Sequence, residues 1–198
     1  MDLPETVDAS DSWQNSVRKL IGSDKVTVHH WRIEPTQAGP LAHTRRSMSA
    51  HTDGTHLPRP PDYVALGCIS PPSFGGATFL LDGHDLIPKL RVGMAAALRE
   101  PRWYWRLPGA DRTRLAAPRA VLAEFGRIRW WRFALWPVDG VQESVADELD
   151  TILIQQQPSV KVEWTSQCAL LFDNARMLHG REAFDGSRVL RRAHLWVN

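Results

Sequence analysis

The chain has 198 residues, of which 43% are hydrophobic and 23% charged, and this composition fits one soluble globular domain with a sizeable core. The formal net charge is only +2, so overall charge gives no argument for nucleic-acid binding. No apolar run approaches the roughly 18–20 residues of a membrane helix, and the opening MDLPETVDAS lacks the pattern of a secretory signal, so a cytoplasmic protein is expected.

The pattern of apolar and turn residues predicts the following elements in chain order. They are a helix at about 11–21, strands at 25–33, 63–70 and 77–83, a helix at 84–100, strands at 128–136, a helix at 141–157, and strands at 160–164, 168–174 and 189–197. The polar segment 34–50 is expected to be a loop. Pro88 suits the first turn of its helix.

Strands dominate both ends of the chain, and helices lie between them. This order predicts a mainly β, antiparallel, barrel-like fold with covering helices, in a single domain spanning residues 1–198. The two cysteines, Cys68 and Cys168, lie in apolar runs and are interpreted as buried thiols rather than a disulfide or a metal pair.

The middle of the chain is rich in arginine and tryptophan. From Arg99 to Arg132 there are nine arginines and three acidic residues, with four tryptophans between them. A solvated face with tryptophans turned into the core would explain this composition. A surface for an anionic ligand, an acidic partner protein or nucleic acid would also explain it. A lid or substrate-contacting insert is expected around residues 99–135.

The stretch SAHTDGTH, residues 49–56, places two metal-ligand side chains at positions i and i+2. On an extended segment His51 and Asp53 would share a face, because side chains alternate along a strand. A capped turn could contain the same residues. The best third ligand is His179, in LLFDNARMLHGREAF. Two histidines and one carboxylate form a facial triad for iron, which leaves three coordination positions open.

The segment GSRVLRRAHLW, residues 186–196, adds arginines near this candidate site. In a strand, Arg188 and Arg192 share one face, and Arg191 lies on the other. Arginines beside a metal ligand are costly unless they meet anions, so they indicate a carboxylate clamp; a solvated rim is the alternative. In GGATFLLDG, Thr78 begins a strand with a hydroxyl that could help an arginine to hold a carboxylate.

These blocks, in this order, resemble the taurine dioxygenase and clavaminate synthase-like family of iron(II)- and 2-oxoglutarate-dependent oxygenases. HTDG, GGAT with LLDG, DNARMLHGREAF and GSRVLRRAHLW carry the resemblance, over roughly residues 45–83 and 140–197. The LHGR block with its trailing arginines is far more specific than the HxD pair. The resemblance implies a double-stranded β-helix, or jelly-roll, core.

The resemblance also implies a role for each matched residue. His51, Asp53 and His179 would bind Fe(II). Thr78 and Arg188 would hold the distal carboxylate of the cosubstrate 2-oxoglutarate, which chelates the iron through its other end.

For other residues near these motifs, the sequence predicts roles that are less specific. Arg191 is an alternative partner for the distal carboxylate, because the loop before Arg188 is short. Arg192 matches a position that often binds an anionic group of the substrate. His56 is interpreted as a residue of the substrate entrance, His194 as a core or rim residue, and Asn174 as the cap of the turn DNAR.

The implied reaction oxidises an unactivated C–H bond with O2 while 2-oxoglutarate becomes succinate and CO2. Hydroxylation is the default outcome; desaturation, cyclisation and epoxidation are alternatives, and the retained Asp53 argues against halogenation. The expected substrate is a small carboxylate-bearing molecule such as an amino acid or natural-product intermediate, free or bound to a carrier protein. Nucleic acid and membrane are not expected partners, and the oligomeric state stays undetermined.

Two other functions are compatible with these residues. A metal-dependent hydrolase or isomerase on a similar barrel could use the same triad to activate water. A non-catalytic binding protein could use the arginine- and tryptophan-rich middle.

Overall fold

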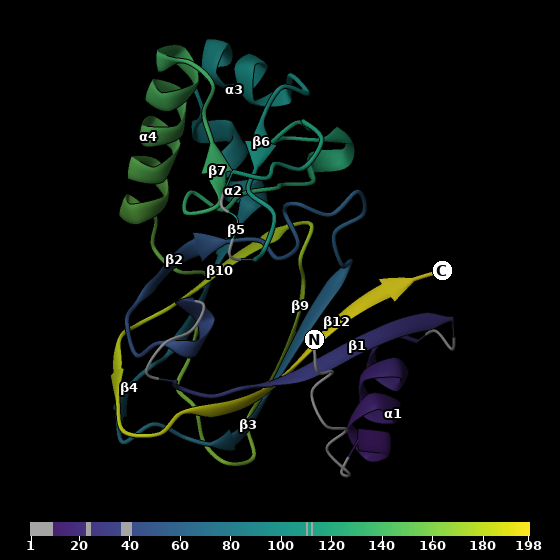
Figure 1. The fold of residues 1–198 in the computed structure, drawn as a ribbon. Helices are drawn as coiled ribbons and strands as arrows, with labels where there is room; N and C mark the ends of the chain where they lie inside the picture. Colours follow the sequence, from purple (N-terminus) through teal and green to yellow (C-terminus); the bar gives the residue numbers. More distant parts are fainter. Residues whose placement is uncertain (1–9, 23–24, 37–40, 110, 112) are drawn as a thin grey trace.

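Two four-stranded antiparallel sheets build the barrel part of the molecule (Figure 1). The first sheet has the order β1-β12-β3-β9 and the second the order β2-β10-β5-β8. The strands are β1 Val26–Ile33, β2 Met48–His51, β3 Tyr63–Ser70, β5 Thr78–Asp82, β8 Val160–Val162, β9 Ala169–Asp173, β10 Met177–Arg181 and β12 Val189–Val197. Successive strands largely alternate between the two sheets, which is the pattern of a jelly roll. The mainly β, barrel-like fold expected from the sequence is confirmed.

The computed structural model describes residues 10–22, 25–36, 41–109, 111 and 113–198. Residues 1–9, which contain most of the MDLPETVDAS stretch, and Arg112 lie outside this part of the chain. The helices are α1 Ser10–Ile21, α2 Gly83–Leu86, α3 Val92–Arg99 and α4 Gly140–Gln155, and two small sheets pair β4 Phe74–Gly75 with β11 Phe184–Asp185 and β6 Tyr104–Trp105 with β7 Leu135–Trp136. None of the described helices has the length and apolarity needed to span a membrane.

Side-chain alternation divides the apolar residues of the second sheet between two cores. In β5, Leu80 packs between the two sheets. Leu81 packs instead against the helical part of the molecule, which runs from α2 to α4, residues 83–155. In β10, Leu178 also packs against the helical part. The next residue, His179, therefore points into the barrel.

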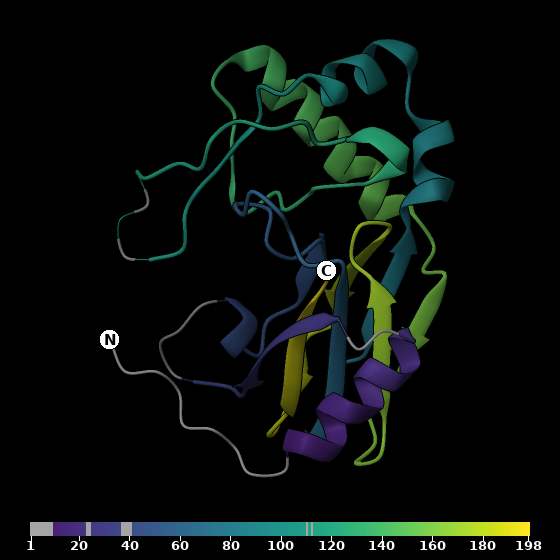
Figure 2. The same cartoon turned by 90° about the vertical axis from the view of Figure 1, so that its right-hand side faces the viewer.

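The helical part covers the outer face of the second sheet (Figure 1). Its core contains side chains from α2, α3 and α4 and three tryptophans with no exposed surface, Trp103, Trp105 and Trp130. On the other side of the barrel, α1 covers the outer face of the first sheet (Figure 2), where Val17 packs with Ala65 and Ala193.

Three sequence expectations about secondary structure are wrong in part. Residues 128–136 form only the two-residue strand β7, because their backbone groups bond to separate loops: Ile128 N–H donates to Ala175 and Arg129 N–H to Val121. The predicted helix 84–100 breaks into α2, a 3₁₀ turn containing Pro88, and α3. The segment 34–50, expected to be a loop, ends in β2.

Cys68 and Cys168 are free thiols, as expected. Both side chains are half-buried rather than buried, which corrects the interpretation from the apolar runs.

Asp82 joins the barrel to the helical part and is expected to contribute to stability. Its carboxylate accepts a hydrogen bond of 2.9 Å from His84 N–H at the start of α2 and pairs with Arg176 across 94 residues of sequence. Asp82→Ala removes both interactions, and we expect a loss of about 1–2 kcal/mol in the free energy of unfolding, measured by urea denaturation. Asp185→Ala, at an exposed aspartate of β11, is the control for removing a surface carboxylate.

The pH dependence of this contribution has a definite sign. The hydrogen bond from Arg176 lowers the pKa of Asp82 in the folded protein. A lowered folded-state pKa means that the contribution is complete above the unfolded pKa of about 3.9 and is lost as the pH falls below it. The stabilities of the wild type and Asp82→Ala should therefore converge below about pH 4, and a constant difference down to pH 2 would contradict this explanation.

Candidate metal centre and cosubstrate pocket

The register between β2 and β10 brings two distant histidines together. His51 is the direct cross-strand partner of His179, so both side chains lie on the inner face of the barrel. Their ring centroids are 4.2 Å apart, and both side chains are almost fully buried. Asp53 follows in the turn after β2. One ligand atom of each of the three residues lies within 4.8 Å of the others, so they could hold a metal ion.

The turn that carries Asp53 is held by hydrogen bonds between its backbone and the side chain of Asn174. Asn174, after β9, accepts a hydrogen bond of 2.8 Å from Asp53 N–H and donates to the carbonyls of Asp53 and Pro61. Gly54 has a φ of +67°, so the chain can turn sharply away from the site. Asn174 thus positions residues 52–54, here called the metal loop, instead of capping the turn DNAR. The carboxylate of Asp173 caps that turn.

Thr52 does more than separate the two ligands. Its N–H donates to the carbonyl of Trp130 at 2.7 Å, and its hydroxyl accepts from Trp130 N–H at 3.0 Å. These bonds tie the metal loop to the segment between β6 and α4. The arginine- and tryptophan-rich middle therefore supports the backbone of the candidate site.

Both candidate histidine ligands are neutral at physiological pH. Burial, with a smaller contribution from His179, holds the pKa of His51 well below its usual value. Burial, followed by His194, lowers the pKa of His179 to about 3. The Nδ1 atom of His51 lies 2.9 Å from the carbonyl of Ser49, which turns Nε2 toward Asp53. Neutral imidazoles with an available nitrogen are the form that binds divalent metals.

The two oxygens of Asp53 have different surroundings. Oδ1 lies 3.7 Å from Nε2 of His51 and 3.9 Å from Nε2 of His179. Oδ2 pairs with the guanidinium of Arg192 and lies 2.9 Å from Nε2 of His194. Only Oδ1 therefore faces the two histidines.

Arg188 lines the same pocket as His51 and His179. Its NH2 group donates to the hydroxyl of Thr78 at 3.0 Å, and Trp164 donates to the same hydroxyl from its indole nitrogen at 3.1 Å. Gly76, with a φ of +73°, passes so close that a Cβ there would lie 3.2 Å from Cδ of Arg188. The structure thus brings Arg188 and Thr78 together as the sequence predicted.

The charge of Arg188 is not balanced by a neighbouring acid in the described part of the chain. Its side chain is buried, its Nε has no hydrogen-bond partner among the described residues, and burial lowers its pKa to about 9. A buried cation of this kind is costly unless an anion joins it. The pocket therefore fits the distal carboxylate of 2-oxoglutarate, with the His51, Asp53 and His179 donor set fitting ferrous iron beside it.

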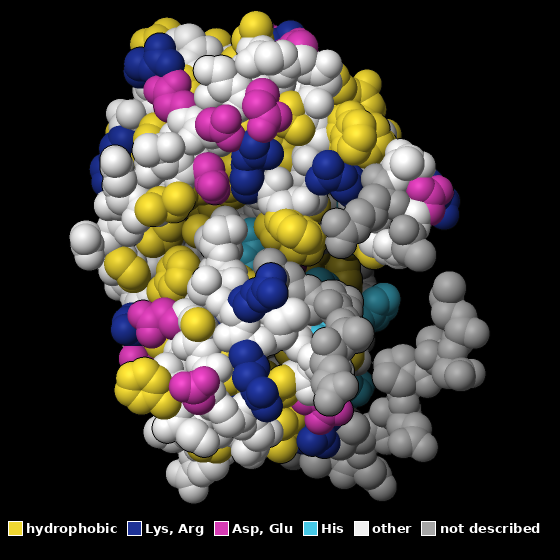
Figure 3. Space-filling model, turned by 60° about the vertical axis from the view of Figure 1, so that its left-hand side comes forward, with side chains coloured by type: hydrophobic (Ala, Val, Ile, Leu, Met, Phe, Trp, Pro, Cys, Tyr) yellow, Lys and Arg dark blue, Asp and Glu magenta, His cyan; other side chains and the backbone are white. Residues whose placement is uncertain are grey.

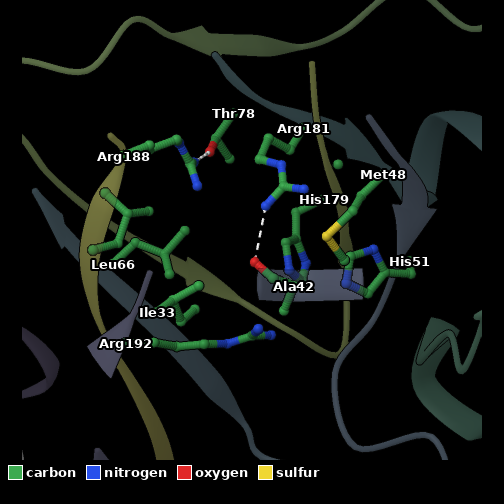
Figure 4. A pocket seen from close by; sticks show the side chains of 12 residues that line it. Ile33, Ala42, Met48, His51, Leu66, Thr78, His179, Arg181, Arg188 and Arg192 are labelled. Atoms are coloured by element: carbon green, nitrogen blue, oxygen red, sulfur yellow. Dashed lines mark hydrogen bonds between the residues drawn. The ribbon is translucent and has the colours of Figure 1, made fainter. Parts of the chain in front are cut away.

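Figure 4 shows how three arginines surround the pocket. Arg188 enters beside Thr78, Arg192 enters from the opposite side, and Arg181 donates to the carbonyl of Ala42 at 3.0 Å. Arg181 also donates to the carbonyl of Thr44 at 2.8 Å, so it fixes the segment before β2 over the pocket. Sequence reasoning missed this role, although Arg181 stands at position i+2 from His179, on the same strand face.

The alternation of β12 separates the other arginines as expected. Arg192 is buried and lines the pocket with Arg188, whereas Arg191 is half-buried and points to the other side of the strand. His194, which is two residues further, shares the inner face with Arg192. It contacts Asp53, which the sequence did not predict.

Most of the arginine- and tryptophan-rich middle has partners within the chain. Trp103, Trp105 and Trp130 are in the core, and Arg132 pairs with Glu143 and Asp147 of α4. Trp131 is only half-buried and lies beside the candidate site: its ring lies 5.6 Å from that of His51 and 6.0 Å from that of the exposed Phe133. Figure 3 shows histidine side chains inside a hollow between the helical part and the barrel, with hydrophobic side chains along its edge.

Comparison with known proteins agrees with this geometry. Residues 24–140 and 133–194 match the family described as "Taurine catabolism dioxygenase TauD, TfdA family". The chain belongs to this family. Membership in the TauD/TfdA family confirms the resemblance inferred from the HTDG, LHGR and GSRVLRR blocks. No curated protein sequence matches the chain.

Solved structures of non-haem iron oxygenases share the fold of this TauD/TfdA family member. An asparagine oxygenase in complex with Fe(II), 2S,3S-3-hydroxyasparagine and succinate has a TM-score of 0.73 and 18% identity, over 83% of this chain and 56% of the other. The oxygenase OrfP with Fe and alpha-ketoglutaric acid has a TM-score of 0.65 and 22% identity, over 84% and 55%. The chain therefore spans little more than half the length of these proteins.

Proposed function

We propose that this chain is an Fe(II)- and 2-oxoglutarate-dependent dioxygenase that hydroxylates an unactivated C–H bond of a small, carboxylate-bearing molecule. The observation that carries this proposal is the juxtaposition of two sites in one pocket. A His51–Asp53–His179 donor set lies beside Arg188, a buried cation hydrogen-bonded to Thr78. A hydrolase or isomerase would need the donor set but not the buried arginine, so the pair favours the oxygenase.

Each group in the pocket has a distinct part in the proposed reaction. His51, His179 and Asp53 would hold the iron and leave adjacent positions open. When bound, iron and 2-oxoglutarate supply the oxidation of a C–H bond by O2, with succinate and CO2 as products. Arg188 would fix the orientation of 2-oxoglutarate by binding its distal carboxylate.

The apolar lining would keep water from this reaction. Ile33, Met48 and Leu66 line the same pocket as the arginines and the histidines (Figure 4). A dry pocket strengthens the electrostatic contacts of the bound anion and limits side reactions.

The substrate would bind where the hollow between the helical part and the barrel opens to solvent. Arg192 is the proposed partner of the substrate carboxylate: it reaches the pocket, burial lowers its pKa only to about 10, and it therefore stays charged. Its guanidinium already pairs with Asp53, so the substrate would use its remaining donors. The segment at 99–135, through Trp131, would contact the substrate or cover it. Amino acids and natural-product intermediates, free or carrier-bound, are the substrates to test first.

Succinate formation tests the function directly. We expect the purified protein with Fe(II) and 2-oxoglutarate, without O2, to show a weak visible charge-transfer band. With O2, a panel of amino acids and related intermediates should include members that stimulate succinate release, and mass spectrometry should find a product heavier by one oxygen atom. Absence of both 2-oxoglutarate binding and succinate formation would overturn the proposal. The free thiols of Cys68 and Cys168 support a cytoplasmic location for the protein. The assays should therefore be run under reducing conditions.

A further inference from the structure

His194 is placed to control how Asp53 presents its carboxylate. It stands in β12 on the same face as Arg192, with Val64 of β3 and His29 of β1 as its cross-strand partners. Its Nε2 lies 2.9 Å from Oδ2 of Asp53, the oxygen that faces away from the other two candidate ligands. The contact joins residues that are 141 positions apart in the sequence.

The imidazole of His194 is fixed by aromatic neighbours. The ring of Trp31 meets it edge to face at a centroid distance of 4.6 Å, and the ring of Trp196 at 5.9 Å with an interplanar angle of 82°. Only 14% of the side chain is exposed. An ionised carboxylate oxygen can only accept a hydrogen bond, so the Nε2 that faces it carries the hydrogen and donates it.

The contact matters because a carboxylate can bind a metal in more than one way. A carboxylate can bind a metal through one oxygen or through both. Binding through both oxygens would occupy one of the three positions that the proposed function needs for a bidentate cosubstrate and O2. Arg192 and His194 together occupy Oδ2 of Asp53, so one oxygen, Oδ1, remains for the metal.

We propose that His194 is a positioning residue for Asp53: by donating a hydrogen bond to Oδ2, it directs Oδ1 toward the metal and keeps the carboxylate monodentate. This inference rests on the proposed function for its metal site. It goes beyond that function because His194 is neither one of the candidate metal ligands nor one of the residues proposed to bind 2-oxoglutarate. The partners of metal ligands commonly change metal affinity 10- to 100-fold when they are removed.

Metal binding, measured without cosubstrate or substrate, tests the proposal. We expect His194→Ala to weaken Co(II) binding in calorimetry by roughly 10- to 100-fold. The visible d–d bands of the bound Co(II) should also change, because a second carboxylate oxygen would raise the coordination number. His194→Gln retains an N–H donor at similar reach and should recover most of the affinity and the wild-type spectrum.

The control is His29→Ala, which removes the exposed cross-strand partner of His194 and leaves Asp53 untouched. Circular dichroism and thermal unfolding establish that each variant folds. Wild-type affinity and spectrum in a folded His194→Ala protein would overturn the proposal, as would a His194→Gln protein no better than His194→Ala. The proposed function fails differently: Co(II) would bind as expected, but no substrate would stimulate succinate formation. If the wild type bound no Co(II), both ideas would be lost.

Discussion

Replacing His51 with alanine is expected to weaken Fe(II) or Co(II) binding by roughly 100-fold or more and to abolish succinate formation, because one of three candidate ligands is removed. The sequence SAHTDGTH offers a matched control, since its second histidine has the same residue type in the same loop. His56 is not part of the group of ligand atoms that includes His51, Asp53 and His179. His56→Ala should therefore retain the wild-type metal affinity.

Calorimetry with Co(II) under anaerobic conditions measures both affinities directly. His51 is 3% exposed and packs between the rings of His179 and Trp131, so its removal also leaves a cavity. Thermal unfolding of each apoprotein separates that structural cost from the loss of a ligand. Equal loss of metal binding in both variants would assign the metal to a different set of residues.

The candidate metal ligands could be selected from the sequence because their signal is local and chemically distinctive. His51 and Asp53 stand two residues apart, and His179 lies in the LHGR block. The strand pairing that brings these residues together could not be predicted from the sequence in the same way. β10 was not predicted as a strand, since His179, Gly180 and Arg181 do not have the β-branched composition that identifies strands. Its pairing with β2 joins segments more than 120 residues apart, and no local pattern reports such a register.

The residues that support the candidate ligands were the hardest to predict. Asn174 holds the backbone of Asp53, and His194 holds its carboxylate, but each does so across a long stretch of sequence. From the sequence alone, Asn174 is an ordinary turn residue and His194 one of several histidines. The predicted strand at 128–136 is wrong for a related reason. Trp130 is of a residue type that is common in strands, yet its backbone N–H donates to the hydroxyl of Thr52 in the turn that carries Asp53.

Arg188 connects the stability of the protein with its proposed function, and Arg188→Met should change the two in opposite directions. The variant removes a buried cation that has no acidic neighbour in the described residues and replaces it with an apolar side chain of similar length. Such replacements are often neutral or stabilising, so the apoprotein should unfold at the same or a higher temperature. The affinity for 2-oxoglutarate should fall by roughly 100-fold or more, because a buried bidentate contact is lost.

Arg191→Met is the matched control, because it makes the same change three residues further along the chain, at a position of β12 that faces away from the pocket. Its affinity for 2-oxoglutarate, measured by calorimetry on the Co(II)-loaded protein, should equal that of the wild type. The reverse result would transfer the distal carboxylate to Arg191. Destabilised apoprotein in Arg188→Met would show instead that its bond to Thr78 and its packing on Trp164 outweigh the cost of burying the charge. If the Arg188→Met apoprotein is stable but has lost its affinity for 2-oxoglutarate, the pocket of the wild type keeps a buried charge that is unfavourable until the anion binds and compensates for it.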